Sequence, residues 1–291
     1  MPWDTRLLVV ALILLPLVSL AAEPPPLVFE APARFAPLAA RLEKLNPHAI
    51  RAAMELVGLQ EPGPPVSITL APEDSQAARH APPWVSGYAL VPSGHIVIFP
   101  DRQISYPYGS LEGVLLHELT HVFVMRVIKG HTGPRWFAEG LATVASGERD
   151  LEDRTWGFWI ELIATRTSLE EIDRWFGEGP PAVHKAYLLA EAFVRYLIAS
   201  FGPDTPRRML REHAAGVSLE EAARAVTGRS LRELENEFWS QQFAWQRWIP
   251  AVTSSAILWM IIVLLSLAAL RKQRQRAAAM KRQWEEEDNE L

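Results

Sequence analysis

Residues 117–121 read His-Glu-Leu-Thr-His, and this pentapeptide restricts how the surrounding chain can fold. On an α-helix, residues i and i+4 lie one turn apart on the same face, so His117 and His121 can direct two imidazoles at one metal ion. Glu118 projects about 100° around the helix axis from His117, where it can hold a water beside the ion. The opposite face is apolar and suits burial against a core (Leu115, Leu119 and Val122). The pattern favours a zinc-binding helix, and the alternative is two histidines in contact beside a chance acid.

A third metal ligand must come from elsewhere in the chain, because a catalytic zinc takes three protein ligands and leaves a fourth position for water. A histidine six residues after His121 would supply it in one known pattern, but that position holds Val127. Residues 134–146 (PRWFAEGLATVAS) instead predict a second helix, with a proline near its start. This helix offers Glu139, and Gly140 beside it allows another helix to approach closely.

Composition narrows the classes of function. The chain of 291 residues is long enough for one sizeable domain with appendages. It has no cysteine, which excludes a disulfide framework, a thiolate zinc site and a cysteine nucleophile. Lys and Arg number 29 against 34 Asp and Glu, with no long basic stretch in the middle of the chain, so nucleic acid is not expected as a partner.

The N-terminal segment predicts export. Residues 7–20 form a short apolar run, and Ser19-Leu20-Ala21 matches the small-x-small pattern that precedes signal-peptidase cleavage. Residues 1–21 are therefore predicted to be a signal peptide. Because Asp4 offsets Arg6 in the region before the apolar run, an uncleaved membrane anchor is the alternative. Either outcome leaves residues 22–248 outside the cytoplasmic membrane, in the periplasm or the extracellular space.

A second apolar segment near the C-terminus predicts a membrane anchor. Residues 249–270 carry no charge, and at about 1.5 Å per helical residue they are long enough to cross a hydrocarbon core of roughly 30 Å. Four basic residues follow this segment (Arg271, Lys272, Arg274 and Arg276). The positive-inside rule then places the tail, residues 271–291, in the cytoplasm. The sequence predicts a single-pass protein of the cytoplasmic membrane with its folded domain outside.

Within residues 22–248, strand patterns precede helical ones. Residues 66–70 (VSITL) alternate as a strand does, and residues 87–100 read as two short strands joined by a Pro-Ser-Gly turn. Helical spacing appears at 33–58, where Pro47 interrupts it, and again at 111–128, 135–146, 155–165, 183–200, 205–214, 218–226 and 230–247. Ser218 with Glu221 and Ser230 with Glu233 predict capping boxes at the last two starts. An α+β fold follows from this order.

H-E-L-T-H, followed by W-F-A-E-G-L-A at 136–142, resembles the gluzincin metallopeptidases, the group of thermolysin and the aminopeptidase N-like enzymes. The E-G-L-A setting is most similar to the peptidase MA-like exported domains. The resemblance covers the order of elements over roughly residues 66–245. It implies a zincin-like catalytic domain, with a small, mostly antiparallel sheet followed by a helical subdomain. It also implies a Zn²⁺ cofactor and a peptide or protein substrate.

The resemblance assigns roles to individual residues. His117, His121 and Glu139 are expected to hold the zinc, and Glu118 is expected to act as the general base that takes a proton from water and returns it to the leaving amine. A further donor must stabilise the oxyanion. Tyr187 is placed, relative to Glu139, as the tyrosine of the aminopeptidase-like enzymes is.

Other residues carry weaker expectations. His184, which corresponds to the thermolysin-like solution, remains the alternative oxyanion donor. His131, in the loop between the two metal-binding helices, is either a substrate contact or a solvated loop residue, and the second interpretation is favoured. Thr143, one turn after the third ligand, is either a hydrogen-bonding partner of a ligand or a packing residue. The strand at 95–99 resembles the zincin edge strand that pairs with extended substrate.

Three alternatives to this interpretation arise from the sequence: an exopeptidase, an intramembrane protease and a non-enzymatic binding module. The Gly-x-Met-Glu-Asn segment with which aminopeptidase-like enzymes capture an amino terminus does not occur here, so an endopeptidase is favoured over an exopeptidase. An intramembrane protease is excluded, because Glu112, Glu118 and Arg126 charge the helix that would have to span the bilayer. The non-enzymatic alternative is an exported module that binds a peptide or partner with a catalytically silent metal site, and the intact Glu118 counts against it.

Overall fold

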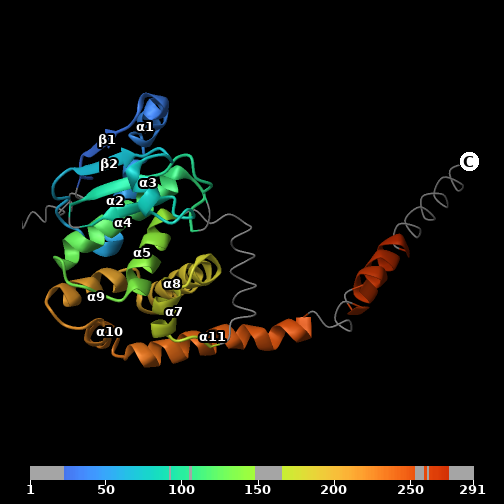
Figure 1. Ribbon diagram of the computed structural model, residues 1–291. Helices are drawn as coiled ribbons and strands as arrows, with labels where there is room; N and C mark the ends of the chain where they lie inside the picture. The colour runs from blue at the N-terminus through green and yellow to red at the C-terminus, as the bar shows by residue number, and fades with distance from the viewer. Residues whose placement is uncertain are drawn as a thin grey trace, which may run out of the picture.

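The computed structural model describes residues 23–91, 93–104, 107–147, 166–252, 259–260 and 262–274 (Figure 1). The predicted signal peptide, the predicted helix at 155–165 and the end of the tail lie outside these residues. A small sheet with three short helices occupies one end of the domain, and helices α7 to α11 occupy the other. Helices α4 and α5 lie between the two halves, so the predicted α+β order, a sheet followed by a helical subdomain, is confirmed.

The sheet is mixed, with the strand order β1-β2-β4-β3. Its strands are β1 (Leu27–Glu30), β2 (Val66–Leu70), β3 (Gly87–Leu90) and β4 (His95–Ile98). The β1–β2 and β2–β4 pairs are parallel, and only β3–β4 is antiparallel. The prediction of a mostly antiparallel sheet was therefore wrong. Helices connect β1 to β2 and bring the chain back to the same end of the sheet, as parallel pairing requires, whereas a short turn joins β3 to β4.

The edge strands of the sheet are β1 and β3, so the prediction that residues 95–99 form an edge strand was also wrong. Strand β4 lies between β2 and β3, and Ile96, Val97 and Ile98 are all buried, as in a strand covered on both faces. His95 accordingly faces a neighbouring strand, with its Nε2 3.0 Å from Oγ1 of Thr69 in β2. A short apolar run such as I-V-I at 96–98 does not by itself distinguish an edge strand from an interior strand.

The helices follow local signals closely. They are α1 (Ala36–Leu42, preceded by a 3-10 turn at Ala33–Phe35), α2 (Pro47–Val57), α3 (Gln76–His80), α4 (Leu111–Ile128), α5 (Arg135–Ser146), α7 (Leu169–Trp175), α8 (Pro180–Phe201), α9 (Thr205–Ala214), α10 (Leu219–Thr227) and α11 (Leu231–Val252). The predicted ranges 111–128, 135–146 and 205–214 coincide with α4, α5 and α9. Both predicted capping boxes form, at the starts of α10 and α11.

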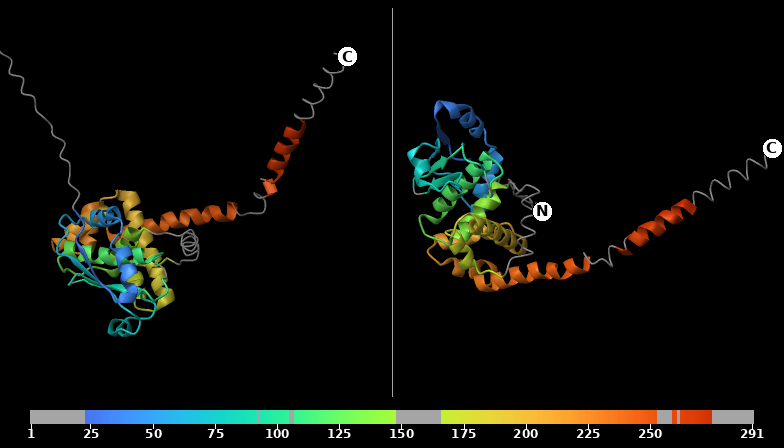
Figure 2. Two further views of the ribbon diagram at one scale, coloured as in Figure 1. Left: turned by 90° about the horizontal axis from the view of Figure 1, so that it is seen from above. Right: turned by 45° about the vertical axis from the view of Figure 1, so that its right-hand side comes forward.

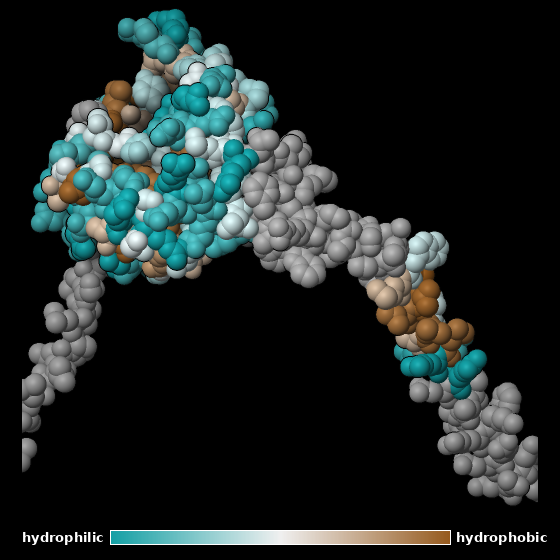
Figure 3. Space-filling view, turned by 90° about the horizontal axis from the view of Figure 1, so that it is seen from below, coloured by the Kyte–Doolittle hydropathy of each residue, from teal (hydrophilic) through white to brown (hydrophobic). Residues whose placement is uncertain are grey.

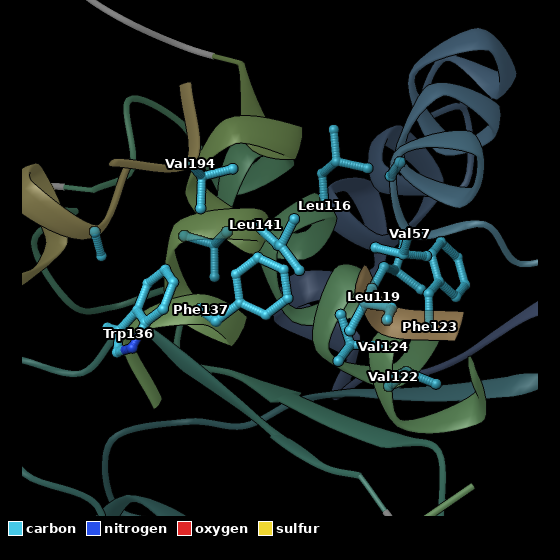
Figure 4. Packing of buried hydrophobic residues seen from close by; sticks show 14 of the residues in the cluster. Val57, Leu116, Leu119, Val122, Phe123, Val124, Trp136, Phe137, Leu141 and Val194 are labelled. Carbon is cyan, nitrogen blue, oxygen red and sulfur yellow. The ribbon is translucent and has the colours of Figure 1, made fainter. Parts of the chain in front are cut away.

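Helix α4 is buried on almost every side because it lies at the centre of the domain. It contacts β3 and β4 of the sheet and the helices α2, α5 and α9. The close-up in Figure 4 shows the resulting core, in which side chains of α4 meet those of α2 and α5 (Val57, Leu116, Leu119, Phe123, Phe137 and Leu141). On the polar face of α4, His117 and Glu118 are buried, whereas His121 is partly exposed.

A glycine sets the distance between α5 and α8. A Cβ on Gly140 would lie 2.6 Å from the carbonyl oxygen of Ala190 and 2.8 Å from Cγ2 of Val194, closer than carbon side chains approach either atom. The predicted close approach at Gly140 is confirmed, and its partner is α8. This contact fixes α5, which carries Glu139, against the helix that carries Tyr187.

The C-terminal part of the chain leaves the domain along α11. This helix starts against the helical half, and its far end projects from the domain in Figure 1 and in both views of Figure 2. No helix among the described residues is both long and apolar enough to cross a membrane. The predicted span, residues 249–270, includes residues 253–258 and 261, which lie outside the description.

Candidate metal centre

Helix α4 supplies two imidazoles and a carboxylate to one site. It begins where the Ser110 side chain accepts a hydrogen bond from the backbone N–H of Gly113, at 3.0 Å, and it runs without a break past the motif. The rings of His117 and His121 lie one turn apart with their centroids 4.9 Å from each other. The helix therefore orients both imidazoles toward the same point, as the spacing of the motif predicts.

Helix α5 brings the third donor to that point. The Oε2 atom of Glu139 lies 3.3 Å from Nε2 of His117 and 3.3 Å from Nε2 of His121. The side chains of His117 and Glu139 are 1% and 8% exposed, and that of His121 is 18% exposed on the side of a cleft. The structure brings together the three residues that the sequence nominated as ligands, and among the described residues they form a cluster able to hold a metal ion.

The geometry and chemistry of these donors fit zinc. Zinc binds histidine nitrogens and carboxylate oxygens at about 2.0–2.2 Å, so two neighbouring ligands of a tetrahedral ion lie about 3.3 Å apart. The two nitrogen–oxygen distances at the site have this value. Two imidazoles and one carboxylate are also a donor set of a catalytic zinc site, with one position left for water.

The charges at the site keep the carboxyl group of Glu139 ionised, the form that binds a cation. Burial acts to raise the pKa of Glu139, but the charge of His121 and hydrogen bonds from both imidazoles outweigh it and hold that pKa well below its usual range. Arg135, one turn earlier on α5, donates from Nε to Oε1 of Glu139 at 3.0 Å. One carboxylate oxygen is thus held by the guanidinium, which leaves the other oxygen to the two imidazoles.

Glu118 lies beside the three donors and differs from Glu139 in its environment. Its side chain is buried, and burial raises its pKa by more than the charges of His121 and His117 lower it. The hydroxyl of Tyr108, in the loop before α4, donates to Oε1 of Glu118 at 3.4 Å. A carboxylate with a raised pKa can accept a proton from water and release it again near neutral pH, which is the requirement for a general base.

These residues lie at the base of a cleft of about 920 Å³. One wall is formed by the chain from the end of α3 through β3, and the other by the segment that joins α7 to the start of α8. Strand β3 begins directly against α4, since a Cβ on Gly87 would lie 2.9 Å from Cγ1 of Val114 and 3.6 Å from Cγ of Glu118. The free edge of the sheet therefore borders the cleft next to Glu118.

Both candidates for the oxyanion donor line this cleft, on the same face of α8. The Tyr187 ring lies 5.9 Å from that of His117, edge to face, and packs at 5.2 Å against Phe176. Burial, together with the negative charges of Glu139 and Glu118, raises the pKa of Tyr187 well above its ordinary value, so the phenol keeps its proton for donation. His184 lies almost one turn earlier on the helix.

The other sequence candidates lie away from the metal donors. His131 is exposed in the loop between α4 and α5, and its ring is 6.2 Å from that of His213. It is not part of the cleft lining. Thr143 donates to the backbone carbonyl of Glu139 at 2.8 Å, a contact within α5 that does not involve the carboxylate.

Two residues at the site escaped the sequence reasoning. Arg135 precedes Glu139 by four positions, so the i,i+4 rule for helical ion pairs could have identified it. Tyr108 gave no such signal, because it lies in a loop with no periodicity. Its ring contacts that of His117 edge to face at 5.0 Å, and its hydroxyl hydrogen-bonds to that of Tyr187 as well as to Glu118.

One comparison with known proteins gives a match. A family model described as the Peptidase MA superfamily matches residues 50–249, from α2 into α11. No curated protein and no solved structure matches the chain significantly. The matched range contains both metal-binding helices and α8, and it extends further toward the N-terminus than the roughly 66–245 over which the resemblance was drawn.

Proposed function

The chain belongs to the peptidase MA superfamily and is a metallopeptidase with a candidate zinc site, and from this premise we propose that it uses zinc to hydrolyse internal peptide bonds of proteins outside the cytoplasmic membrane. The observation that carries the proposal is the convergence of His117, His121 and Glu139, with Glu118 beside them, at the base of an open cleft. The decisive test combines the zinc content of the purified full chain with its activity on unfolded protein substrates.

The chain's own residues divide the work of the reaction. Zinc held by the three donors would lower the pKa of water to about 7 and would polarise the carbonyl of the substrate. Glu118 takes the proton from the attacking water and transfers it to the departing amine. Arg135 holds the far oxygen of Glu139, which keeps that carboxylate in one orientation. A protonated side chain on α8 then donates to the oxyanion that develops on the substrate.

The substrate is expected to lie in the cleft as an extended strand. The edge of β3 borders the cleft beside Glu118, and an extended peptide can pair with a free sheet edge through backbone hydrogen bonds. Such pairing recognises the main chain and is compatible with many sequences. It also supports cleavage within unfolded or extended segments.

The lining of the cleft supports an endopeptidase. The acidic side chains among the described lining residues are Glu118 and Glu139, and both have roles in the chemistry. An aminopeptidase needs a further acid to bind the amino terminus of its substrate. Its absence from the described lining agrees with the absence of a Gly-x-Met-Glu-Asn segment from the sequence.

Tyr187 is proposed as the oxyanion donor. We expect Tyr187→Phe to lower kcat by about 10²- to 10³-fold, the usual effect of removing one such donor, with little change in KM or zinc content. The phenylalanine keeps the ring contacts with His117 and Phe176, so the loss reports on the hydroxyl. His184→Gln is the matched variant on the same helix and should retain most of the activity. The reverse result, with the loss confined to His184→Gln, would assign the donor to the histidine.

Anchoring in the cytoplasmic membrane is proposed from the C-terminal sequence. Among the described residues 259–260 and 262–270, the large apolar side chains are exposed (Trp259, Met260, Ile262, Val263, Leu264, Leu265, Leu267 and Leu270). Figure 3 shows this hydrophobic surface apart from the largely hydrophilic domain, followed by a hydrophilic end that holds Arg271, Lys272 and Arg274. A bilayer would cover these side chains, and the basic residues would remain on its cytoplasmic side.

The anchor predicts a specific fractionation pattern. The full chain should remain in carbonate-washed membranes, and a reporter fused after Leu291 should be active only in the cytoplasm. Replacing Val263 and Leu264 together by arginine should release the protein, because each arginine at the centre of a span costs about 3 kcal/mol. The matched exchange Val263→Leu with Leu264→Val should stay in the membrane. Reporter activity outside the cytoplasm would contradict the orientation.

A further inference from the structure

A buried arginine connects several segments of one cleft wall through hydrogen bonds. The Arg102 side chain is 5% exposed, and all five of its N–H donors have acceptors. Nε and Nη2 donate to the two carboxylate oxygens of Glu73, at 2.8 and 3.1 Å, and Nη2 also donates to the carbonyl of Ala78, at 3.0 Å. The guanidinium stacks 4.0 Å above the ring of Phe99.

The two remaining donors of Arg102 hold a tight turn. Nη1 donates to the carbonyls of Pro82 and Val85, each at 2.8 Å. The N–H of Val85 donates to the carbonyl of Pro82 at 3.0 Å, so residues 82–85 form a β-turn with Pro83 at its second position, where proline is favoured. Both ends of the turn are therefore tied to one buried group.

The third position of this turn holds a half-exposed tryptophan. Trp84 is 46% exposed and lines the same cleft as the metal donors. Tryptophan is a highly buried residue on average, and its ring is rigid and amphipathic. The arginine contacts stabilise the turn that presents Trp84, yet the side chain itself remains open to the cleft. This combination is typical of a preformed binding surface.

We propose that Trp84 forms a subsite for a large apolar or aromatic side chain of the peptide substrate. The inference rests on the proposed function and names a specificity that the function itself leaves open. The lining residues next to Trp84 in the chain are apolar (Ala81, Pro82 and Val85), and the titratable residues of this wall, His80 and Tyr88, lie beyond them on either side. An apolar side chain that packs against the indole would remove its own surface, and the indole face that it covers, from water.

The position of the turn limits which substrate residue it can contact. Trp84 precedes Gly87, the residue of β3 beside Glu118, by three positions, so the two lie at most about 11 Å apart along the chain. An extended peptide advances about 3.3 Å per residue. The side chain bound by Trp84 therefore belongs to a residue within about three positions of the cleaved bond.

Peptide binding to an inactive full chain tests the subsite separately from catalysis. The probe is a set of fluorescein-labelled nonapeptides of alanine and serine with one phenylalanine at each position in turn, bound to zinc-loaded Glu118→Gln protein in detergent and followed by anisotropy. We expect one or two phenylalanine positions to tighten binding. Adding Trp84→Ala should weaken those peptides about tenfold or more, since truncating an interfacial tryptophan typically has such an effect. The peptide without phenylalanine should change little.

Two further variants control for indirect effects. Trp84→Phe keeps an aromatic surface and should retain most of the phenylalanine preference. Val28→Ser removes an apolar side chain that is 50% exposed on β1, at the opposite edge of the sheet, and should leave the preference unchanged. A preference that survives Trp84→Ala would overturn the subsite. So would a Trp84→Ala effect limited to weaker binding of phosphatidylglycerol vesicles, which would assign the tryptophan to a membrane surface.

The binding result also separates this inference from the proposed function. Phenylalanine-selective binding that depends on Trp84, in a protein whose wild type hydrolyses no peptide, would support the proposed subsite and contradict the proposed hydrolase activity. Hydrolysis by the wild type with a selectivity that Trp84→Ala does not alter would support the hydrolase activity and contradict the subsite.

Discussion

Replacing Glu118 by glutamine is expected to lower peptide hydrolysis by about 10²- to 10⁴-fold, the contribution of a general base, while the protein keeps its zinc. The amide has the size of the carboxylate and can still accept the hydrogen bond from Tyr108, so the buried packing around position 118 should persist. It cannot take a proton from water. Zinc should remain, because the three donors that converge are His117, His121 and Glu139.

The measurement is kcat on an unfolded protein substrate, with zinc quantified in the same preparation. Glu112→Gln is the matched control, since Glu112 lies on the first turn of the same helix and pairs with Arg41 at 2.8 Å, away from the cleft. It should retain activity. Undiminished hydrolysis by Glu118→Gln would remove the proposed mechanism. A wild type that holds zinc but cleaves no member of a broad peptide library would favour the binding module.

Replacing Glu139 by alanine is expected to weaken zinc binding by more than about a hundredfold, because partners that only orient a ligand already contribute about 10- to 100-fold. Glu139 supplies the anionic donor, and its low pKa keeps it ionised over the neutral range. Without it, two imidazoles remain, and Arg135 is left beside the site without its carboxylate partner. The loss should equal that of His117→Ala, measured as zinc retained against a competing chelator.

Two variants frame this result. His131→Ala removes a histidine from the loop between the same two helices and should bind zinc as the wild type does, since His131 is exposed and lies outside the cleft. Arg135→Met should give an intermediate loss, because it frees the second oxygen of Glu139 without removing a donor. Equal losses in His131→Ala and Glu139→Ala would contradict the assignment of the third ligand.

The helical half of the fold was predictable because its signals are local. The starts of α10 and α11 follow from Ser218 and Ser230, each with a glutamate three residues later, and α4 and α5 match their predicted ranges. The sheet was less accessible. Strand β1 was missed, and the pairing of β2 with β4 depends on contacts between distant segments that no local pattern encodes.

The residues of the site also fall into those that local patterns predict and those that tertiary contacts place. His117 and His121 follow from the helical repeat, and Glu139 from a second helix at a recognisable distance along the chain. Tyr108 and Trp84 reach the cleft from a loop and a turn, and their positions depend on tertiary contacts, such as the hold of Arg102 on the turn. The residues expected to perform the chemistry were thus visible in the sequence, whereas those that shape the cleft were not.

The contact at Gly140 couples two parts of the site mechanically. Glu139 directly precedes this glycine on α5, and Tyr187 lies three residues before Ala190, the residue that Gly140 touches on α8. The backbone of α5 at Gly140 lies against the carbonyl of Ala190 and Cγ2 of Val194, so the spacing of the helices that carry the third metal ligand and the proposed oxyanion donor leaves no room for a side chain at position 140. The absence of a side chain at position 140 thus allows the close spacing of α5 and α8. The relative placement of the residues on these two helices depends on this spacing, and preorganised sites require precise placement of this kind.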